Sequence, residues 1–111
     1  MADPLDEGTF DTLAERALRA LEMALNDIEG IEADLESGIV TIEFDDGVRF
    51  VINSHRAARQ IWMSAGARAW HFDIDPTSGV WRATKTAEEL WACLKQQVEQ
   101  KLGRAIELAP R

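Results

Sequence analysis

The residues up to Gly30 repeat their apolar positions at the spacing of an amphipathic helix. This pattern predicts a helix that begins between Pro4 and Thr9 and ends near Glu29, with Gly30 as its C-terminal stop. The side of this helix that we expect to face a core is formed by Phe10, Leu13, Leu18, Leu21, Leu25 and Ile28.

Polar and apolar residues alternate after this helix, which is the period of a strand with one buried face. We expect strands at residues 31–36, 39–44 and 48–53. Asp46 and Gly47 form a dipeptide that is typical of a type I′ turn, so the second and third strands are predicted to pair as a hairpin. The inward side chains of this hairpin are expected to be Val40, Ile42, Phe44, Val48, Phe50 and Ile52.

Three more strands are predicted at residues 59–64, 70–74 and 80–83. In the first of them the aliphatic residues share one parity, which places Trp62 on the opposite, outward face. The inward residues of the first two segments are expected to be Ile61, Met63, Trp70, Phe72 and Ile74.

A second helix is predicted near the C-terminus. Thr86, with Glu89 three residues later, has the form of a capping box, and the apolar stripe runs to about Leu102 before Gly103. The order of elements predicts an α+β fold, a two-layer sandwich of two helices packed on one face of a five- or six-stranded antiparallel sheet. We expect a single domain that covers residues 1–111.

Charge is distributed unevenly along the chain. The formal net charge is −8; residues 1–48 contain 14 acidic and 2 basic side chains, whereas residues 49–111 contain 6 acidic and 10 basic ones. This imbalance disfavours nucleic acid and anionic membranes as partners of the first half and favours a cation or a basic protein surface. No segment has the apolar length of a membrane span, and the first residues are acidic, so we expect a cytoplasmic monomer.

Carboxylates gather where the first helix meets the first strand. One stripe of the helix and one face of residues 31–36 are acidic, and together they predict an anionic ridge. Carboxylate oxygens suit hard cations such as Fe²⁺, Fe³⁺, Mn²⁺ and Ca²⁺, but exposed and widely spaced groups predict weak, partly hydrated and poorly selective binding. The members of the ridge are Asp11, Glu15, Glu22, Glu29, Glu32, Asp34 and Glu36.

Four short motifs give the chain a family resemblance. They are D-D-G at residues 45–47, V-I-N at 51–53, Q-I-W at 60–62 and W-H-F-D at 70–73. With the order of elements and the acidic first helix and strand, they make the chain resemble the frataxin family, and its bacterial branch in particular, over nearly its whole length. The resemblance implies an iron-binding protein of iron–sulfur cluster assembly that docks on the cysteine desulfurase, with the cluster scaffold protein as a further partner.

Residue chemistry and the resemblance together select candidate site residues. Iron, as Fe²⁺ or Fe³⁺, is expected to bind weakly at the surface, and the candidate ligands are Glu22, Asp27, Glu29, Glu32 and Asp34. The resemblance implies partner contacts at Asn53, Gln60 and Trp62, which also have the composition of a protein-binding patch. Met23 and Asn26 stand where the pattern of bacterial relatives has acidic residues.

Histidine and cysteine chemistry adds little at this point. His55 and His71 could each be a metal ligand, but they are sixteen residues apart in separate predicted elements. His71 faces outward beside Asp73 and could add one ligand to an accessory site, although we expect it to be a surface histidine without a role. Cys93 is the one cysteine, and it lies beside the apolar stripe of the second helix, where we expect a packed thiol.

Three functions stay open. The preferred one is an iron-responsive regulator or iron donor; the alternatives are a metal-independent acidic adaptor that binds proteins and a weak ferroxidase with iron at paired carboxylates. An acidic helix face or strand edge can also be no more than a solvated surface that prevents aggregation. The sequence contains no catalytic constellation that we can argue, so we expect a protein that is not an enzyme.

Overall fold

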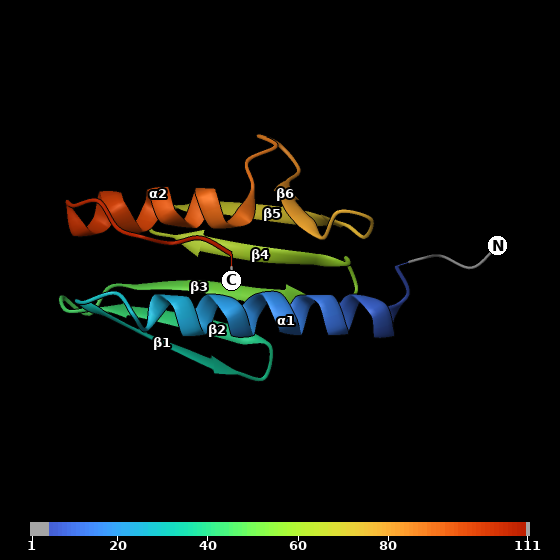
Figure 1. Ribbon diagram of the computed structural model, residues 1–111, viewed down its shortest axis with the longest axis horizontal. Coiled ribbons are helices and arrows are strands. Elements are labelled where there is room, and N and C mark those ends of the chain that lie inside the picture. The colour runs from blue at the N-terminus through green and yellow to red at the C-terminus, as the bar shows by residue number, and fades with distance from the viewer. Residues whose placement is uncertain (1–4, 111) are drawn as a thin grey trace.

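The structure is a computed structural model that describes residues 5–110. The chain runs through one helix, six strands and a second helix (Figure 1). The elements are α1 (Glu7–Leu25), β1 (Ile31–Glu36), β2 (Ile39–Phe44), β3 (Arg49–His55), β4 (Gln60–Ala65), β5 (Arg68–Asp75), β6 (Val80–Ala83) and α2 (Leu90–Leu102).

The strands form one antiparallel sheet in the order β1-β2-β3-β4-β5-β6, so each strand pairs with its neighbours in the sequence. Both helices lie on one face of this sheet, with α1 against β1–β3 and α2 toward β6 (Figure 1). The predicted two-layer α+β sandwich is therefore confirmed, with six strands. Neither of the helices within residues 5–110 is long and apolar enough to cross a membrane.

The core fills the space between the helices and the inward face of the sheet. Trp70, Trp81 and Trp91 are buried there, as predicted. Cys93 is also buried, and this burial raises the pKa of its thiol to about 12, so the thiol stays protonated at neutral pH.

The first helix is shorter than predicted. It ends at Leu25, and Glu29 and Gly30 lie in the turn that follows. The C-cap, Asn26, donates from Nδ2 to the carbonyl oxygen of Ala33 (2.8 Å) and accepts from the N–H of Ala33 at Oδ1 (2.9 Å). The chain leaves the helix at this residue because its side chain is hydrogen-bonded to the first strand.

The turn between β2 and β3 also differs from the prediction. Only Gly47 of the Asp46-Gly47 pair has a positive φ, 85°, so the type I′ turn was wrong. Phe44 donates to the carbonyl of Val48 and accepts from the N–H of Gly47, both at 2.9 Å, which closes a three-residue loop with glycine in the left-handed position. Val48 lies outside the strand and is 38% exposed, so its predicted core position was wrong as well.

The second helix begins later than the predicted capping box. Its N-cap is Glu89, whose carboxylate accepts from backbone N–H groups of the first turn, while Thr86 lies in the preceding loop. The predicted end is confirmed, because the helix stops at Leu102 and Gly103 adopts the left-handed conformation with φ 73°.

Candidate functional site

The face of the sheet opposite the helices is open, and the strand register arranges its outward side chains in rows across the strands. One row starts at the acidic edge strand and crosses the middle of the sheet; its members are Glu36, Ile39, Asn53, Trp62 and His71. Asp34 begins the next row along β1. The acidic strand and the patch around Trp62 are therefore parts of one continuous surface.

Trp62 is half-buried on this face because two histidines stack on its ring. His55 lies on one side, with ring centroids 3.9 Å apart and planes 14° from parallel; His71 lies on the other, at 4.3 Å and 12°. Trp62 faces outward, as predicted. The two histidines, for which we expected no such contact, stack on the indole from β3 and β5.

The polar groups around Trp62 are ordered by hydrogen bonds. The indole Nε1–H donates to Oε1 of Gln60 (2.8 Å), and Nε2 of Gln60 donates to Oδ1 of Asp73 (3.0 Å). Asn53 stands directly opposite Trp62 on β3. The structure thus brings the three predicted partner-binding residues together as a fixed aromatic ring with amides at its rim, which suits protein recognition.

Glu22 is already engaged within the fold. Its half-buried carboxylate accepts a hydrogen bond from the N–H of Leu35 on β1. Asn26, one turn later, binds Ala33 on the same strand edge. We call Glu22 and Asn26 the β1 edge clasp, because they satisfy backbone groups of an edge strand that would otherwise be open to another chain. This structural task competes with the predicted role of Glu22 as an iron ligand.

The other four predicted ligands surround one corner of the molecule. Asp27 and Glu29 lie in the turn between α1 and β1, and Glu32 and Asp34 lie on the outward face of β1. All four side chains are exposed. Arg104 donates to the backbone carbonyl of Glu29 and so brings one cation into this corner. We call these four residues the acidic corner.

The carboxylates of the acidic corner are spaced too widely for a metal ion to contact more than one or two of them. Glu32 stands directly opposite Glu43 on β2, and Arg49 donates to Oε2 of Glu43 at 2.9 Å. Within residues 5–110, no three His, Cys, Asp or Glu side chains are close enough together to hold a metal ion. An ion bound here would keep much of its water shell, so weak and poorly selective binding stays the prediction for iron.

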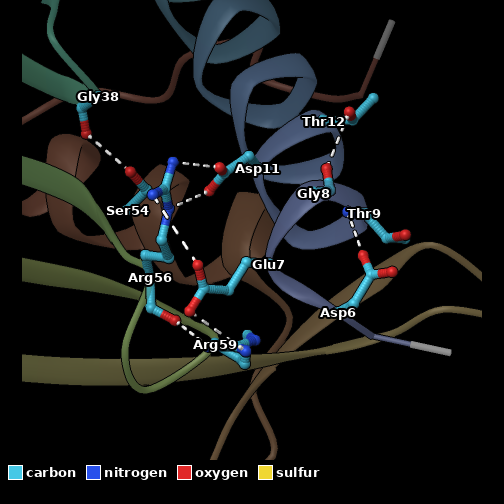
Figure 2. A network of polar contacts seen from close by, with 10 residues as sticks. All are labelled: Asp6, Glu7, Gly8, Thr9, Asp11, Thr12, Gly38, Ser54, Arg56 and Arg59. Carbon is cyan, nitrogen blue, oxygen red and sulfur yellow. Dashed lines mark hydrogen bonds and ion pairs between the residues drawn. The ribbon is translucent and has the colours of Figure 1, made fainter. Parts of the chain in front are cut away.

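The N-terminal half of the acidic helix stripe is neutralised by arginines (Figure 2). Arg56, in the turn between β3 and β4, reaches both carboxylate oxygens of Asp11 and lies 3.9 Å from Glu7. Within the helix, Arg19 pairs with Glu15 at 2.9 Å. These pairs offset part of the acidic charge in the first half of α1.

A family model described as "Frataxin-like domain" matches residues 3–104 of the chain. The chain belongs to the frataxin-like family. The resemblance expected from the V-I-N and Q-I-W motifs is thereby confirmed, and the structure places these motifs side by side on β3 and β4. In this frataxin-like chain they carry Asn53, Gln60 and Trp62.

Relatives of known name match over nearly the full chain. "Iron-sulfur cluster assembly protein CyaY" of Dechloromonas aromatica is 37% identical over 109 residues, covering 94% of this chain and 99% of the relative. The protein of the same name from Paraburkholderia phymatum is 30% identical over 107 residues, covering 96% of this chain and 100% of the relative.

Two solved structures share the frataxin fold with this chain. The frataxin of Psychromonas ingrahamii superposes with a TM-score of 0.84 at 17% identity, covering 93% of this chain and 97% of that one. Yeast frataxin superposes with a TM-score of 0.70 at 23% identity, covering 85% of this chain and 80% of the yeast chain. The two-layer arrangement is therefore shared with solved structures that differ widely in sequence.

Two features of this frataxin-like surface escaped the sequence analysis, namely the histidine stack on Trp62 and the Arg56 pairs. The parity of residues around His71 already pointed it outward beside Trp62, so strand pairing would have indicated the first contact. The pairing of Arg56 with Asp11, 45 residues away in sequence, left no local signal.

Proposed function

We propose that this frataxin-like protein acts in iron–sulfur cluster assembly, binding iron as cargo and docking on the cysteine desulfurase. The continuity of the acidic β1 edge with the Trp62 row on one open face carries the proposal. The names of the relatives, which match over nearly their full length, support the process. The cluster scaffold protein is proposed as a further partner of the same face.

The two parts of the surface have different physical tasks in this proposal. The acidic corner attracts a basic surface and iron, whereas the rigid Trp62 ring and its amides fix the register of the docked partner. Iron bound at the corner lowers the negative charge that the desulfurase meets. The protein thereby responds to iron as a regulator or hands iron on as a donor, and we propose a binding protein rather than an enzyme.

A second candidate function is a metal-independent adaptor whose carboxylates serve docking alone. The hydrogen bond from Leu35 to Glu22, which occupies one carboxylate oxygen of a predicted ligand, favours this candidate. Weak ferroxidase activity is a third proposal, and Glu32 and Glu43 are the facing pair at which two iron ions would meet carboxylates.

An amide-resolved NMR titration with Fe²⁺ under anaerobic conditions, repeated with the desulfurase, tests the proposal. We expect broadening and shifts at the acidic corner with iron, and at the acidic corner and Trp62 with the partner. The matched variant is Glu32→Gln with Asp34→Asn, which removes both charges and replaces one oxygen of each carboxylate by NH₂ while keeping side-chain size, and it should lose the iron response.

The possible outcomes separate the candidates. If iron perturbs no defined region while the desulfurase still binds, the carboxylates are docking charges and the adaptor is correct. If neither iron nor the desulfurase perturbs the open face, the proposed function is wrong.

Replacement of Trp62 by arginine is expected to weaken desulfurase binding about tenfold, because it removes an aromatic anchor at the centre of the patch. The two stacking contacts are also lost, so the free energy of unfolding should fall by about 1 kcal/mol. Calorimetric binding and thermal melting measure the two effects. Ser64→Ala, an exposed site on the same strand face, is the control and should change neither quantity; equal binding by both variants would remove Trp62 from the interface.

A further inference from the structure

A pocket of about 290 Å³ lies near the β6 edge of the sheet. The acidic corner lies at the other edge, which is formed by β1. The pocket opens between the first half of β5 and the segment that follows β6, where the chain runs out from the sheet edge before α2 (Figure 1). Its lining residues are Arg68, Ala69, Trp70, His71, Ala83, Thr84, Lys85 and Thr86.

The side chains of this pocket make it basic. Arg68, Lys85 and His71 are all exposed, and among the residues that line the pocket there is no carboxylate. Arg68 is held in place because its guanidinium lies 4.8 Å from the centre of the Trp70 ring. Burial and the neighbouring carboxylate of Glu88 raise the pKa of the Cys93 thiol, and Glu88 is not among the residues that line the pocket. The pocket therefore presents positive charge that no lining group offsets.

The pocket also contains a stretch of strand edge without a strand neighbour. The register of β5 with β6 covers Phe72–Asp75, so the preceding residues of β5, which include Ala69, extend past the end of β6. In the part of the chain that the structure describes, the N–H of Thr84 donates to the carbonyl of His71 across this gap (2.8 Å). An uncovered strand edge is a template for an extended peptide backbone.

We propose that this pocket binds an extended acidic segment of a partner protein. The cations and the threonine hydroxyls fit carboxylate side chains, and the β5 edge fits the backbone of the segment. A small anion would use the charges alone and leave the strand edge unused. The proposal goes beyond the proposed function and depends on neither iron nor the desulfurase.

The pocket joins the open face through one residue. His71 lines the pocket and also stacks on Trp62, so a segment bound along β5 would meet the row that contains Trp62. The molecule would then bind a basic partner surface along β1 and an acidic partner surface along β5. This arrangement matches the uneven distribution of charge along the chain.

The test is an NMR titration of the full chain with an acetylated and amidated pentapeptide of alternating glutamate and valine. We expect amide shifts at residues 68–71 and 84–86, and none with the lysine–valine counterpart. Lys85→Glu, which changes an exposed side chain, should weaken binding at least about fivefold. Arg16→Glu on α1 is exposed and changes the net charge equally, so it is the matched control and should change affinity less than about twofold.

Two results would overturn the proposal. The first is the absence of shifts in the pocket with the acidic peptide. The second is inorganic phosphate producing the same shifts with equal or higher affinity, because the pocket would then be a simple anion site that ignores the strand edge. A melting temperature of Lys85→Glu equal to that of the natural chain ensures that weaker binding reflects the pocket and not unfolding.

Discussion

Replacing Asn26 with alanine is expected to lower the free energy of unfolding by about 2 kcal/mol and the melting temperature by about 10 °C. The reason is that the side chain makes two hydrogen bonds, at 2.8 and 2.9 Å, to the backbone of Ala33 on the edge strand. Alanine cannot make either bond, so one donor and one acceptor of β1 lose their partners. Thermal and urea unfolding followed by circular dichroism measure the change.

Met23 provides the matched control for this prediction. It lies one turn earlier on the same helix, it is 59% exposed, and Met23→Ala should change stability by less than about 0.5 kcal/mol. Asn26→Asp makes a finer test, because a carboxylate can accept from the Ala33 N–H but cannot donate to its carbonyl. An Asn26→Ala variant as stable as the natural chain would show that the Asn26 part of the β1 edge clasp contributes nothing to stability.

Reversal of two charges on β1, Glu32→Lys with Asp34→Lys, is expected to weaken binding to the desulfurase on the order of a hundredfold. Both side chains are exposed on the outward face of the strand, so the folded structure should persist with little change in melting temperature. The loss should shrink as salt is added, since the attraction between exposed charges is screened. Calorimetry at two ionic strengths measures the affinity and its salt dependence.

Glu107→Lys is the control for the single reversals Glu32→Lys and Asp34→Lys. Glu107 is exposed in the C-terminal segment, which runs on the helix side of the molecule (Figure 1), and its reversal changes the net charge by the same amount. If Glu107→Lys lowers the affinity for the desulfurase as much as Asp34→Lys does, the net charge governs binding. The acidic corner would then contribute no more than other acidic residues.

Alternation along the strands allowed most of the fold to be predicted from the sequence. The bounds of β1, β2 and β6 agree with the prediction, because one buried face forces apolar residues to every second position. The same argument placed Trp62 and His71 outward. The local pattern of apolar residues was therefore sufficient to predict strands and the face on which each side chain lies.

Features that depend on distant contacts could not be predicted. The end of α1 is set by Asn26 reaching Ala33, and the use of Glu22 depends on its meeting Leu35. An apolar period cannot contain this information, because it records which side of a helix is buried and not what its polar side chains touch. The iron ligands therefore stay a prediction, and the sequence did not indicate that the carboxylate of Glu22 accepts a hydrogen bond from β1.

The sheet is built in chain order, from hairpin to hairpin, and β1 occupies its first position. The acidic residues on β1 meet the like charge of Glu43 only across the pairing with β2, at the periphery of the sheet. Arg49 on β3 pairs with Glu43 and offsets part of the repulsion in this outer part of the sheet. Because β1 has β2 as its one strand neighbour in the sheet, its like charges face fewer side chains across a strand pairing than they would at the centre of the sheet.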